Sequence, residues 1–232
     1  MSSTTSKTAK RYSRGDLHRY QIRAADFIKD TPNCALWVDM GLGKTVTVLT
    51  AIADLLHSFD IHRVLIIAPL RVSTTTWPAE IGLWEHTRHL RYRNVQGAPA
   101  NRRAILAHDT SDIHIINREL VPWLIEQVKL NGGDWPYDMV VIDEASSFKS
   151  SKSERFKALR KALPAIPRMV QLTGTPASNG LLDVWAQIYL LDQGARLGRT
   201  FGGYKAKYFD ADYMGYNFSL KSGTADRIYE TL

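Results

Sequence analysis

The sequence predicts an α/β domain in which a central, mostly parallel sheet is flanked by helices. Five short apolar runs lack any alternation of polar and apolar residues, as is typical of strands that are buried on both faces. Helical stretches lie before, between and after these runs, and such alternation indicates a doubly wound sheet. The length of 232 residues fits one large domain of this class better than two small ones.

The predicted elements follow one another regularly as far as residue 191. The strands are expected at Cys34–Met40, Val64–Ala68, Ile113–Ile116, Met139–Ile142 and Arg168–Leu172. The helices are expected at Leu17–Lys29, Thr45–His57, Ser153–Ala162 and Leu181–Leu191. Beyond Leu191 the pattern weakens, and the remaining residues leave room for no second complete sheet.

The composition is that of a globular protein, with 44% hydrophobic and 23% charged residues. No apolar run reaches the roughly 18 residues of a membrane helix, and the polar start of the chain is no secretory signal. The single cysteine, Cys34, lies in an apolar run and is expected to be a buried thiol in a reducing compartment. Lys and Arg outnumber Asp and Glu by 30 to 23, and this net charge of +7 favours a polyanionic partner.

A glycine-rich segment joins the first predicted strand to the helix that follows it. Gly41 and Gly43, on either side of Leu42, allow a tight turn and a close approach to phosphate oxygens. The start of a helix offers free N–H groups and a partial positive charge. Lys44 would reach the β and γ phosphates, and the Thr45 hydroxyl would bind Mg²⁺. The segment therefore predicts a site for MgATP.

An acidic pair follows the apolar run Met139–Ile142. Nucleoside triphosphatases need one carboxylate for Mg²⁺ and another to polarise the attacking water. We assign the first role to Asp143 and the second, general base, to Glu144. Because ligands bind at the carboxyl ends of parallel strands, the pair is expected to meet Lys44 there.

With these two motifs in order, the sequence resembles the first RecA-like domain of superfamily-two helicases, in particular the Swi/Snf-type DNA translocases and their compact bacterial and phage relatives. The resemblance runs from about Asp16 to about Phe209. It includes the absence of the leading glycine of the strict phosphate-loop pattern, where this chain has Val38. The fold it implies is that of a RecA-like P-loop NTPase domain.

Other motifs carry family roles onto this chain. Leu17–Gln21 resembles the opening motif, which implies that Gln21 contacts adenine. Leu172–Pro176 resembles the coupling motif, which implies that Thr173, Gly174 and Thr175 sense the γ-phosphate. Asn179, Leu182 and Trp185 match the Swi/Snf-type continuation, and Lys149 falls where a family Lys follows the acidic box. In that box Ser146 replaces the His that helps to relay between ATP and the motor interface.

Two segments resemble the family's contacts to a nucleic-acid backbone. They imply contacts from Arg71 and Ser73 in the first segment and from Asn117 and Arg118 in the second, where such donors fix position without reading sequence. Trp77 and Trp84 are interpreted as core aromatics rather than base-stacking platforms, and the basic run 149–161 as a solvated helix face. The basic and aromatic segment Arg196–Tyr208 either contacts DNA or docks a second domain.

The leading hypothesis is an ATP-dependent helicase or translocase that moves on double-stranded DNA in the cytoplasm of a bacterial or phage-infected cell. Residues 1–15 would be a disordered tail, 16–195 the first ATP-binding domain, and 196–232 an extension toward a second RecA-like domain that this chain lacks. Since that second domain supplies the arginine finger in the family, we expect weak MgATP binding and poor turnover from this chain. An RNA-directed helicase, an ATPase subunit of a restriction or remodelling assembly, and a hydrolysis-deficient nucleic-acid-binding domain, which Ser146 slightly favours, remain as alternatives.

Overall fold

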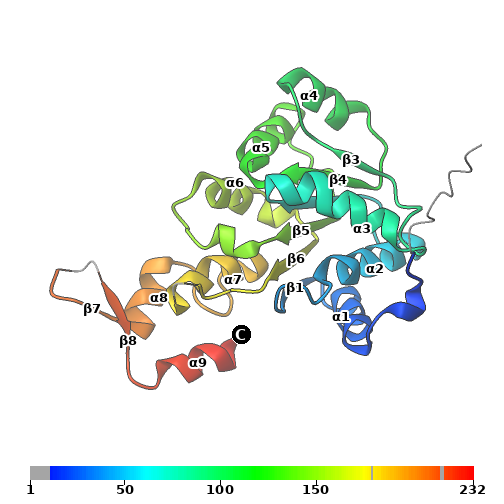
Figure 1. Ribbon diagram of the computed structural model, residues 1–232. Helices are drawn as coiled ribbons and strands as arrows, with labels where there is room; N and C mark the ends of the chain where they lie inside the picture. The colour runs from blue at the N-terminus through cyan, green and yellow to red at the C-terminus, as the bar shows by residue number, and fades with distance from the viewer. Residues whose placement is uncertain (1–10, 179, 215–216) are drawn as a thin grey trace, which may run out of the picture.

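The computed structural model describes residues 11–178, 180–214 and 217–232, and a six-stranded parallel sheet forms its centre (Figure 1). The strand order is β1-β6-β5-β2-β4-β3. These strands are β1 (Asn33–Trp37), β2 (Val64–Ala68), β3 (Tyr92–Asn94), β4 (Ile113–Asn117), β5 (Met139–Asp143) and β6 (Arg168–Thr173). The predicted class, a mostly parallel sheet flanked by helices, is confirmed.

Helices cover both faces of this sheet. The α-helices of the described residues are α1 (Arg19–Asp30), α2 (Lys44–His57), α3 (Trp77–Leu83), α4 (Pro99–His108), α5 (Val121–Leu130), α6 (Glu154–Ala162), α7 (Val184–Asp192), α8 (Phe201–Tyr208) and α9 (Thr224–Thr231). One core cluster packs α1, α2 and α3 against the sheet, and the other packs α5, α6 and α7 against the opposite face. The two groups lie on opposite sides of the sheet in Figure 1.

The central strands explain why the sequence shows no polar alternation. In β2, Val64 and Ile66 belong to the cluster with α2, whereas Leu65 and Ile67 belong to the cluster with α5 and α6. All four side chains are 0% exposed. Each side of the strand thus needs apolar residues, as the continuous run predicts.

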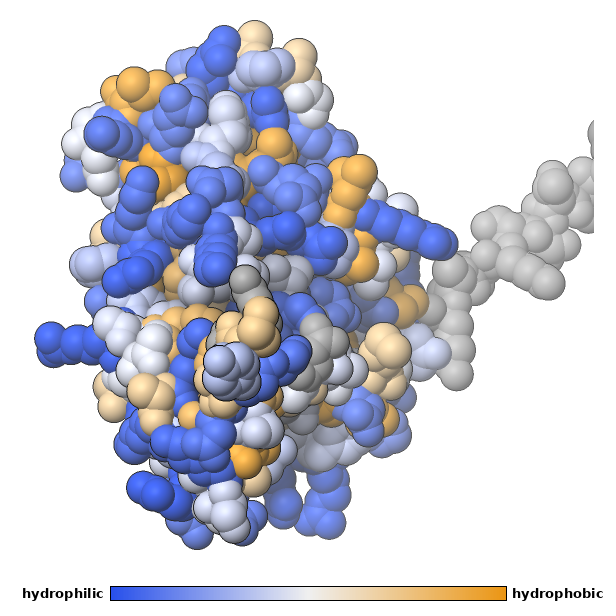
Figure 2. All heavy atoms as spheres, turned by 90° about the vertical axis from the view of Figure 1, so that its left-hand side faces the viewer, coloured by the Kyte–Doolittle hydropathy of each residue, from blue (hydrophilic) through white to orange (hydrophobic). Residues whose placement is uncertain are grey.

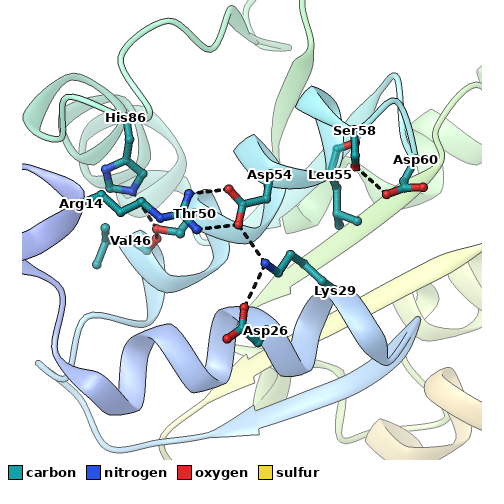
Figure 3. A network of polar contacts seen from close by, with 10 residues as sticks. All are labelled: Arg14, Asp26, Lys29, Val46, Thr50, Asp54, Leu55, Ser58, Asp60 and His86. Carbon is teal, nitrogen blue, oxygen red and sulfur yellow. Dashed lines mark hydrogen bonds and ion pairs between the residues drawn. The ribbon is translucent and has the colours of Figure 1, made fainter.

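The chain before α1 is fastened to the domain by a short segment, Tyr12–Asp16, which we call the N-terminal strap. Tyr12 pairs with Trp84, and Arg14 donates to the Asp54 carboxylate of α2 at 2.5 and 2.8 Å. Lys29 of α1 joins the same carboxylate at 3.0 Å (Figure 3). Within the expected tail, Tyr12, Ser13 and Arg14 thus make defined contacts, and residues 1–10 lie outside the described residues.

The last part of the chain folds back onto α7. Helix α8 is followed by an antiparallel hairpin, β7 (Phe209–Ala211) and β8 (Phe218–Leu220), and then by α9. Tyr204 and Tyr208 of α8 are buried, and the Tyr204 hydroxyl donates to the Leu181 carbonyl at 2.8 Å. These two aromatic rings are core residues, so any contact of Arg196–Tyr208 with DNA would come from its basic side chains.

The side of the molecule that carries α8 and the hairpin is mostly hydrophilic, with hydrophobic residues scattered over it rather than gathered in one patch (Figure 2). Among the described residues, no helix is long and apolar enough to cross a membrane.

Candidate nucleotide site and nucleic-acid interface

The glycine-rich loop connects β1 to α2 in a conformation that only glycine adopts without strain. Gly41 has φ +81° and Gly43 has φ +69°. A Cβ atom on Gly43 would collide with the side-chain amide of Gln21. Gly43 is the N-cap of α2, and no side chain of the described residues caps the helix there. The first N–H groups of α2 are therefore free to bind an anion.

Lys44 is the first residue of α2, and its ammonium group bends back over the loop. It donates to the carbonyls of Val38 at 2.7 Å and Asp39 at 3.0 Å. The next residue, Thr45, is half-buried, and its hydroxyl makes no hydrogen bond within the part of the chain that the structure describes. Both side chains lie at the start of the helix, beside the free N–H groups.

The opening motif lies against the same loop. Gln21 is 5% exposed; its Oε1 accepts from the His18 backbone N–H at 2.8 Å, and its Nε2 faces the Leu42 carbonyl at 3.5 Å. The Tyr20 hydroxyl donates to the Leu42 carbonyl at 3.0 Å. Tyr20 is a loop contact that the sequence analysis missed, although the residue stands next to Gln21 in the motif.

The acidic pair lies at the carboxyl end of β5. Asp143 is 8% exposed, and burial raises the pKa of its carboxyl group. The hydrogen bond from the Trp77 indole lowers this pKa, and so does the positive charge of Lys44. The negative charge of Glu144 raises the pKa further. Glu144 is half-buried and has φ +54°, an uncommon conformation that residues at functional sites adopt more often than others.

The coupling turn joins the phosphate loop to the acidic strand because β6 lies between β1 and β5. The Thr173 carbonyl accepts from the Val38 N–H at 3.2 Å, and the Thr173 hydroxyl accepts from the Thr175 N–H at 3.1 Å. The position of a Cβ atom on Gly174 would lie 3.4 Å from the Met40 nitrogen. The turn is therefore packed directly on the phosphate loop.

The residues that follow the two motifs are also connected. Lys149 donates to the Ser178 hydroxyl at 3.0 Å and to the Asp183 carboxylate at 3.2 Å. This links the segment after the acidic box to the segment after the coupling turn. Ser146 is half-buried in the 3₁₀ turn Ala145–Phe148, whereas Asn179 lies outside the described residues.

The residues expected to contact nucleic acid lie where β2 and β4 end, and most are engaged locally. Ser73 is 3% exposed, and its hydroxyl donates to the Leu70 carbonyl at 2.8 Å. The Asn117 side chain accepts from the Glu119 N–H at 3.3 Å, and Arg118 pairs with Glu119 at 3.3 Å. Arg71 is exposed, and its side chain makes no hydrogen bond in the described part of the chain.

Ser73 and Asn117 line the same pocket, which has a volume of about 200 Å³. Its wall also contains Leu70 and the side chain of Arg102, whose guanidinium group stacks over Trp123 at 4.4 Å. Arg102 was not among the expected nucleic-acid contacts, and no family motif in the sequence singles it out.

The two tryptophans of this region are core residues, as expected. Trp77 is 0% and Trp84 is 8% exposed. The Trp77 indole N–H donates to the Asp143 Oδ2 at 2.9 Å, a contact that the sequence analysis did not foresee. The only signal in the sequence is general: a buried indole N–H needs an acceptor.

A family model described as "SNF2-related domain" matches residues 10–196. The chain belongs to this family. It is 35% identical over 196 residues to "Putative protein p41" of Acyrthosiphon pisum secondary endosymbiont phage 1, covering 82% of this chain and 42% of that protein. It is 31% identical to the "DNA excision repair protein ERCC-6-like" of Bos taurus, covering 70% of this chain and 13% of that protein.

The SNF2-related chain also resembles the solved structure titled "Sulfolobus solfataricus SWI2/SNF2 ATPase core in complex with dsDNA". The TM-score is 0.69 at 24% identity, with 83% of this chain and 39% of that chain covered. This likeness confirms the RecA-like fold. The chain spans less than half the length of the relatives it matches.

Proposed function

We propose that this SNF2-related chain is the nucleotide-binding half of an ATP-dependent motor that moves on double-stranded DNA. The observation that carries the proposal is the meeting of three motifs at one edge of the sheet. The phosphate loop, the coupling turn and the acidic pair follow the adjacent strands β1, β6 and β5. A triphosphate at the start of α2 would therefore have Lys44, Thr173 and Asp143 around it.

The residues at this edge fit a nucleotide with Mg²⁺. The donor set consists of a hydroxyl on Thr45 and a buried carboxylate on Asp143, which are oxygen ligands of the kind Mg²⁺ prefers. Within the described ranges no group of three His, Cys, Asp or Glu side chains forms a metal cage. Mg²⁺ keeps several waters and binds through one or two carboxylates together with phosphate oxygens, so it needs no such cage. When bound, the ion would neutralise charge on the transferred phosphoryl group.

The residues of the chain would divide the remaining work. Gln21 would contact adenine, and Gly41, Leu42 and Gly43 would present backbone N–H groups to the phosphates. Lys44 would leave its two carbonyl partners for the β and γ phosphates. Glu144 would accept a proton from the attacking water, since it adjoins Asp143 and remains half-buried rather than enclosed.

Coupling to nucleic acid would pass through the turn of Thr173, Gly174 and Thr175, which touches the phosphate loop. Arg71, Ser73, Asn117 and Arg118 would contact the phosphate backbone. DNA as the partner is supported by the names of two relatives, a DNA excision repair protein and an ATPase core bound to double-stranded DNA. The net charge of +7 suits a polyanion.

The domain division that we propose places the nucleotide site in residues 16–195, with 196–232 as an extension toward a second RecA-like domain. That domain would contribute an arginine finger across the nucleotide. The chain would work in the cytoplasm of a bacterial or phage-infected cell, in line with the phage relative.

The nucleotide site is tested by thermal melting with MgATP. Wild type should be stabilised by about 2.7 kcal/mol at 100 times the dissociation constant. Lys44→Ala should lose most of this stabilisation, because the ammonium group is the main positive charge at the loop. Lys129→Ala, on the exposed side of α5, is the matched control and should behave as wild type. Equal shifts in all three proteins would place the nucleotide elsewhere.

A further inference from the structure

The indole of Trp77 is joined to the carboxylate that we assign to Mg²⁺. Trp77 is the first residue of α3, and its Nε1 donates to the Asp143 Oδ2 at 2.9 Å. The other oxygen, Oδ1, accepts from the Glu144 N–H at 3.0 Å. Each oxygen of the carboxylate therefore has one fixed donor, and together the two donors set the plane of the group.

This bond lies in the interior of the domain. Trp77 is 0% exposed and Asp143 is 8% exposed, so neither group is freely hydrated. A hydrogen bond from a second residue orients a carboxylate that binds a metal ion. Phenylalanine would fill most of the same space, but it has no N–H group. The tryptophan thus provides a donor that hydrophobic packing alone does not require.

Trp77 is also the end of the segment that carries two expected nucleic-acid contacts. It directly follows a π-helical turn, η2 (Val72–Thr76), and this turn begins after the exposed Arg71. The turn is held by hydroxyl groups that bond to its own backbone, such as Thr75 to the Arg71 carbonyl at 2.7 Å. π-Helical turns are rare and are frequent at functional sites.

A short path therefore connects the outside of the domain to the metal site. Arg71 and η2 face the proposed backbone contact, Trp77 ends the turn, and its indole holds Asp143. If a phosphate backbone shifts η2, the indole N–H shifts with it, and the carboxylate loses or gains its fixed orientation. Linkage requires the converse, so that metal-bound nucleotide changes the affinity for the polynucleotide by the same factor.

We propose that Trp77 is a positioning residue that holds Asp143 for Mg²⁺ and transmits engagement of a phosphate backbone at residues 71–76 to the metal site. This inference rests on the proposed function, in which Asp143 binds the ion. It adds a role that hydrophobic burial of the tryptophan does not include.

The test measures how much Mg²⁺ strengthens the binding of ADP. Dissociation constants for ADP are determined by calorimetry with Mg²⁺ and with EDTA, and their ratio is the metal increment. Trp77→Phe should reduce this increment about tenfold, or about 1.4 kcal/mol, and leave binding in EDTA unchanged. Trp84→Phe is the matched control. Trp84 is the C-cap residue of α3, and its indole N–H donates to the Glu80 carboxylate at 3.1 Å rather than to Asp143.

A second variant separates the N–H group from packing. Replacing Trp77 by 3-benzothienylalanine keeps the ring shape and substitutes sulfur for the N–H group, so it should fold as wild type and show the same tenfold loss. A full metal increment in this variant overturns the inference. Asp143→Asn distinguishes a failure of this inference from a failure of the proposed function. If Asp143→Asn retains the metal increment, the assignment of Asp143 to Mg²⁺ is wrong. If Asp143→Asn loses the increment and both variants at position 77 keep it, only the role of Trp77 is wrong.

The link to nucleic acid is measured in the same experiment with saturating duplex DNA. DNA should change the metal increment in wild type and in Trp84→Phe, and it should have little effect in either variant at position 77. Transmission through Trp77 would be contradicted if DNA changed the metal increment as much in the variants at position 77 as in wild type. It would also be contradicted if DNA left the metal increment of wild type unchanged.

Discussion

The nucleotide edge and the nucleic-acid edge of the sheet differ in how far their polar groups are already engaged. Where β1 ends, the first N–H groups of α2 have no side-chain cap, and in the described part of the chain the Thr45 hydroxyl has no partner. Where β2 and β4 end, Ser73 and Asn117 bond to their own backbone. The nucleotide edge therefore offers donors and a hydroxyl that are not yet engaged, and only Lys44 has to leave its carbonyl partners. At the other edge, Ser73 and Asn117 both have to exchange hydrogen bonds to receive a ligand.

This difference has an energetic meaning. Exchange of one hydrogen bond for another contributes little net free energy, typically about 1 kcal/mol. Binding at the nucleic-acid edge should then depend mainly on charges that have no partner in the free protein. Arg71 meets that condition better than Arg118, which pairs with Glu119.

The strongest test of the nucleotide edge is Glu144→Gln. If Glu144 is the general base, release of phosphate from MgATP should slow about 10²-fold or more, because amides do not accept the proton. Binding of MgATP should persist, since Lys44 and Asp143 are intact. Glu126→Gln, an exposed change on α5, serves as the control. Hydrolysis at the wild-type rate in Glu144→Gln would remove this residue from the chemistry.

Comparison of Arg71→Ala with Arg118→Ala tests the nucleic-acid edge. Arg71→Ala should weaken duplex DNA binding more, and the slope of log affinity against log salt should fall by about 0.9, as for one phosphate contact. Arg118→Ala should have the smaller effect because Arg118 already pairs with Glu119 at 3.3 Å, a carboxylate that it shares with Arg155. Fluorescence anisotropy over a salt series measures both. Equal losses would show that Glu119 does not restrain Arg118, and tighter binding to RNA than to DNA would favour the RNA-directed alternative.

The smallest expected effect concerns the base of α2, behind the nucleotide edge. Asp54→Asn should lower the free energy of unfolding by about 1 kcal/mol, because Arg14 and Lys29 both bond to this carboxylate. The hydrogen bond from Arg14 is the largest cause of the lowered pKa of Asp54. The stabilisation is thus fully present above the pKa that Asp54 has in the unfolded chain, about 3.9. It is lost as the pH falls through the lower pKa that Asp54 has in the folded protein.

Denaturant titrations at several pH values measure this effect, and the wild-type advantage should shrink below about pH 4. Asp60→Asn is the control, since Asp60 bonds only to the neighbouring Ser58 hydroxyl in the network of Figure 3. A difference that stays constant down to low pH would mean that ionised Asp54 is not its source.

Elements with a strong apolar pattern could be predicted from the sequence. Strands β2 and β5 were located to within a residue, because burial on both faces requires a continuous apolar run. The first strand was predicted to reach Met40 but ends at Trp37, since Asp39 and Met40 are exposed and belong to the phosphate loop. β3 was missed because it is three residues long and mostly exposed.

The candidate site was predictable where motifs are contiguous and in register. Lys44 and Asp143 could be assigned to one ligand because both follow buried parallel strands. The bond between Trp77 and Asp143 joins residues 66 positions apart and depends on how α3 packs. Likewise, helix α8 contains Gly202 and Gly203, so its pattern gave no indication that Tyr204 is buried in the core.

The N-terminal strap bears on how the protein can be shortened or tagged. Arg14 ties the chain to the same helix that begins with Lys44, and Tyr12 rests against Trp84 at the end of α3. A protease site or truncation placed just before the opening motif would cut this fastening from both helices, although it would leave every sequence motif intact. An affinity tag attached ahead of residue 10 leaves the fastening in place.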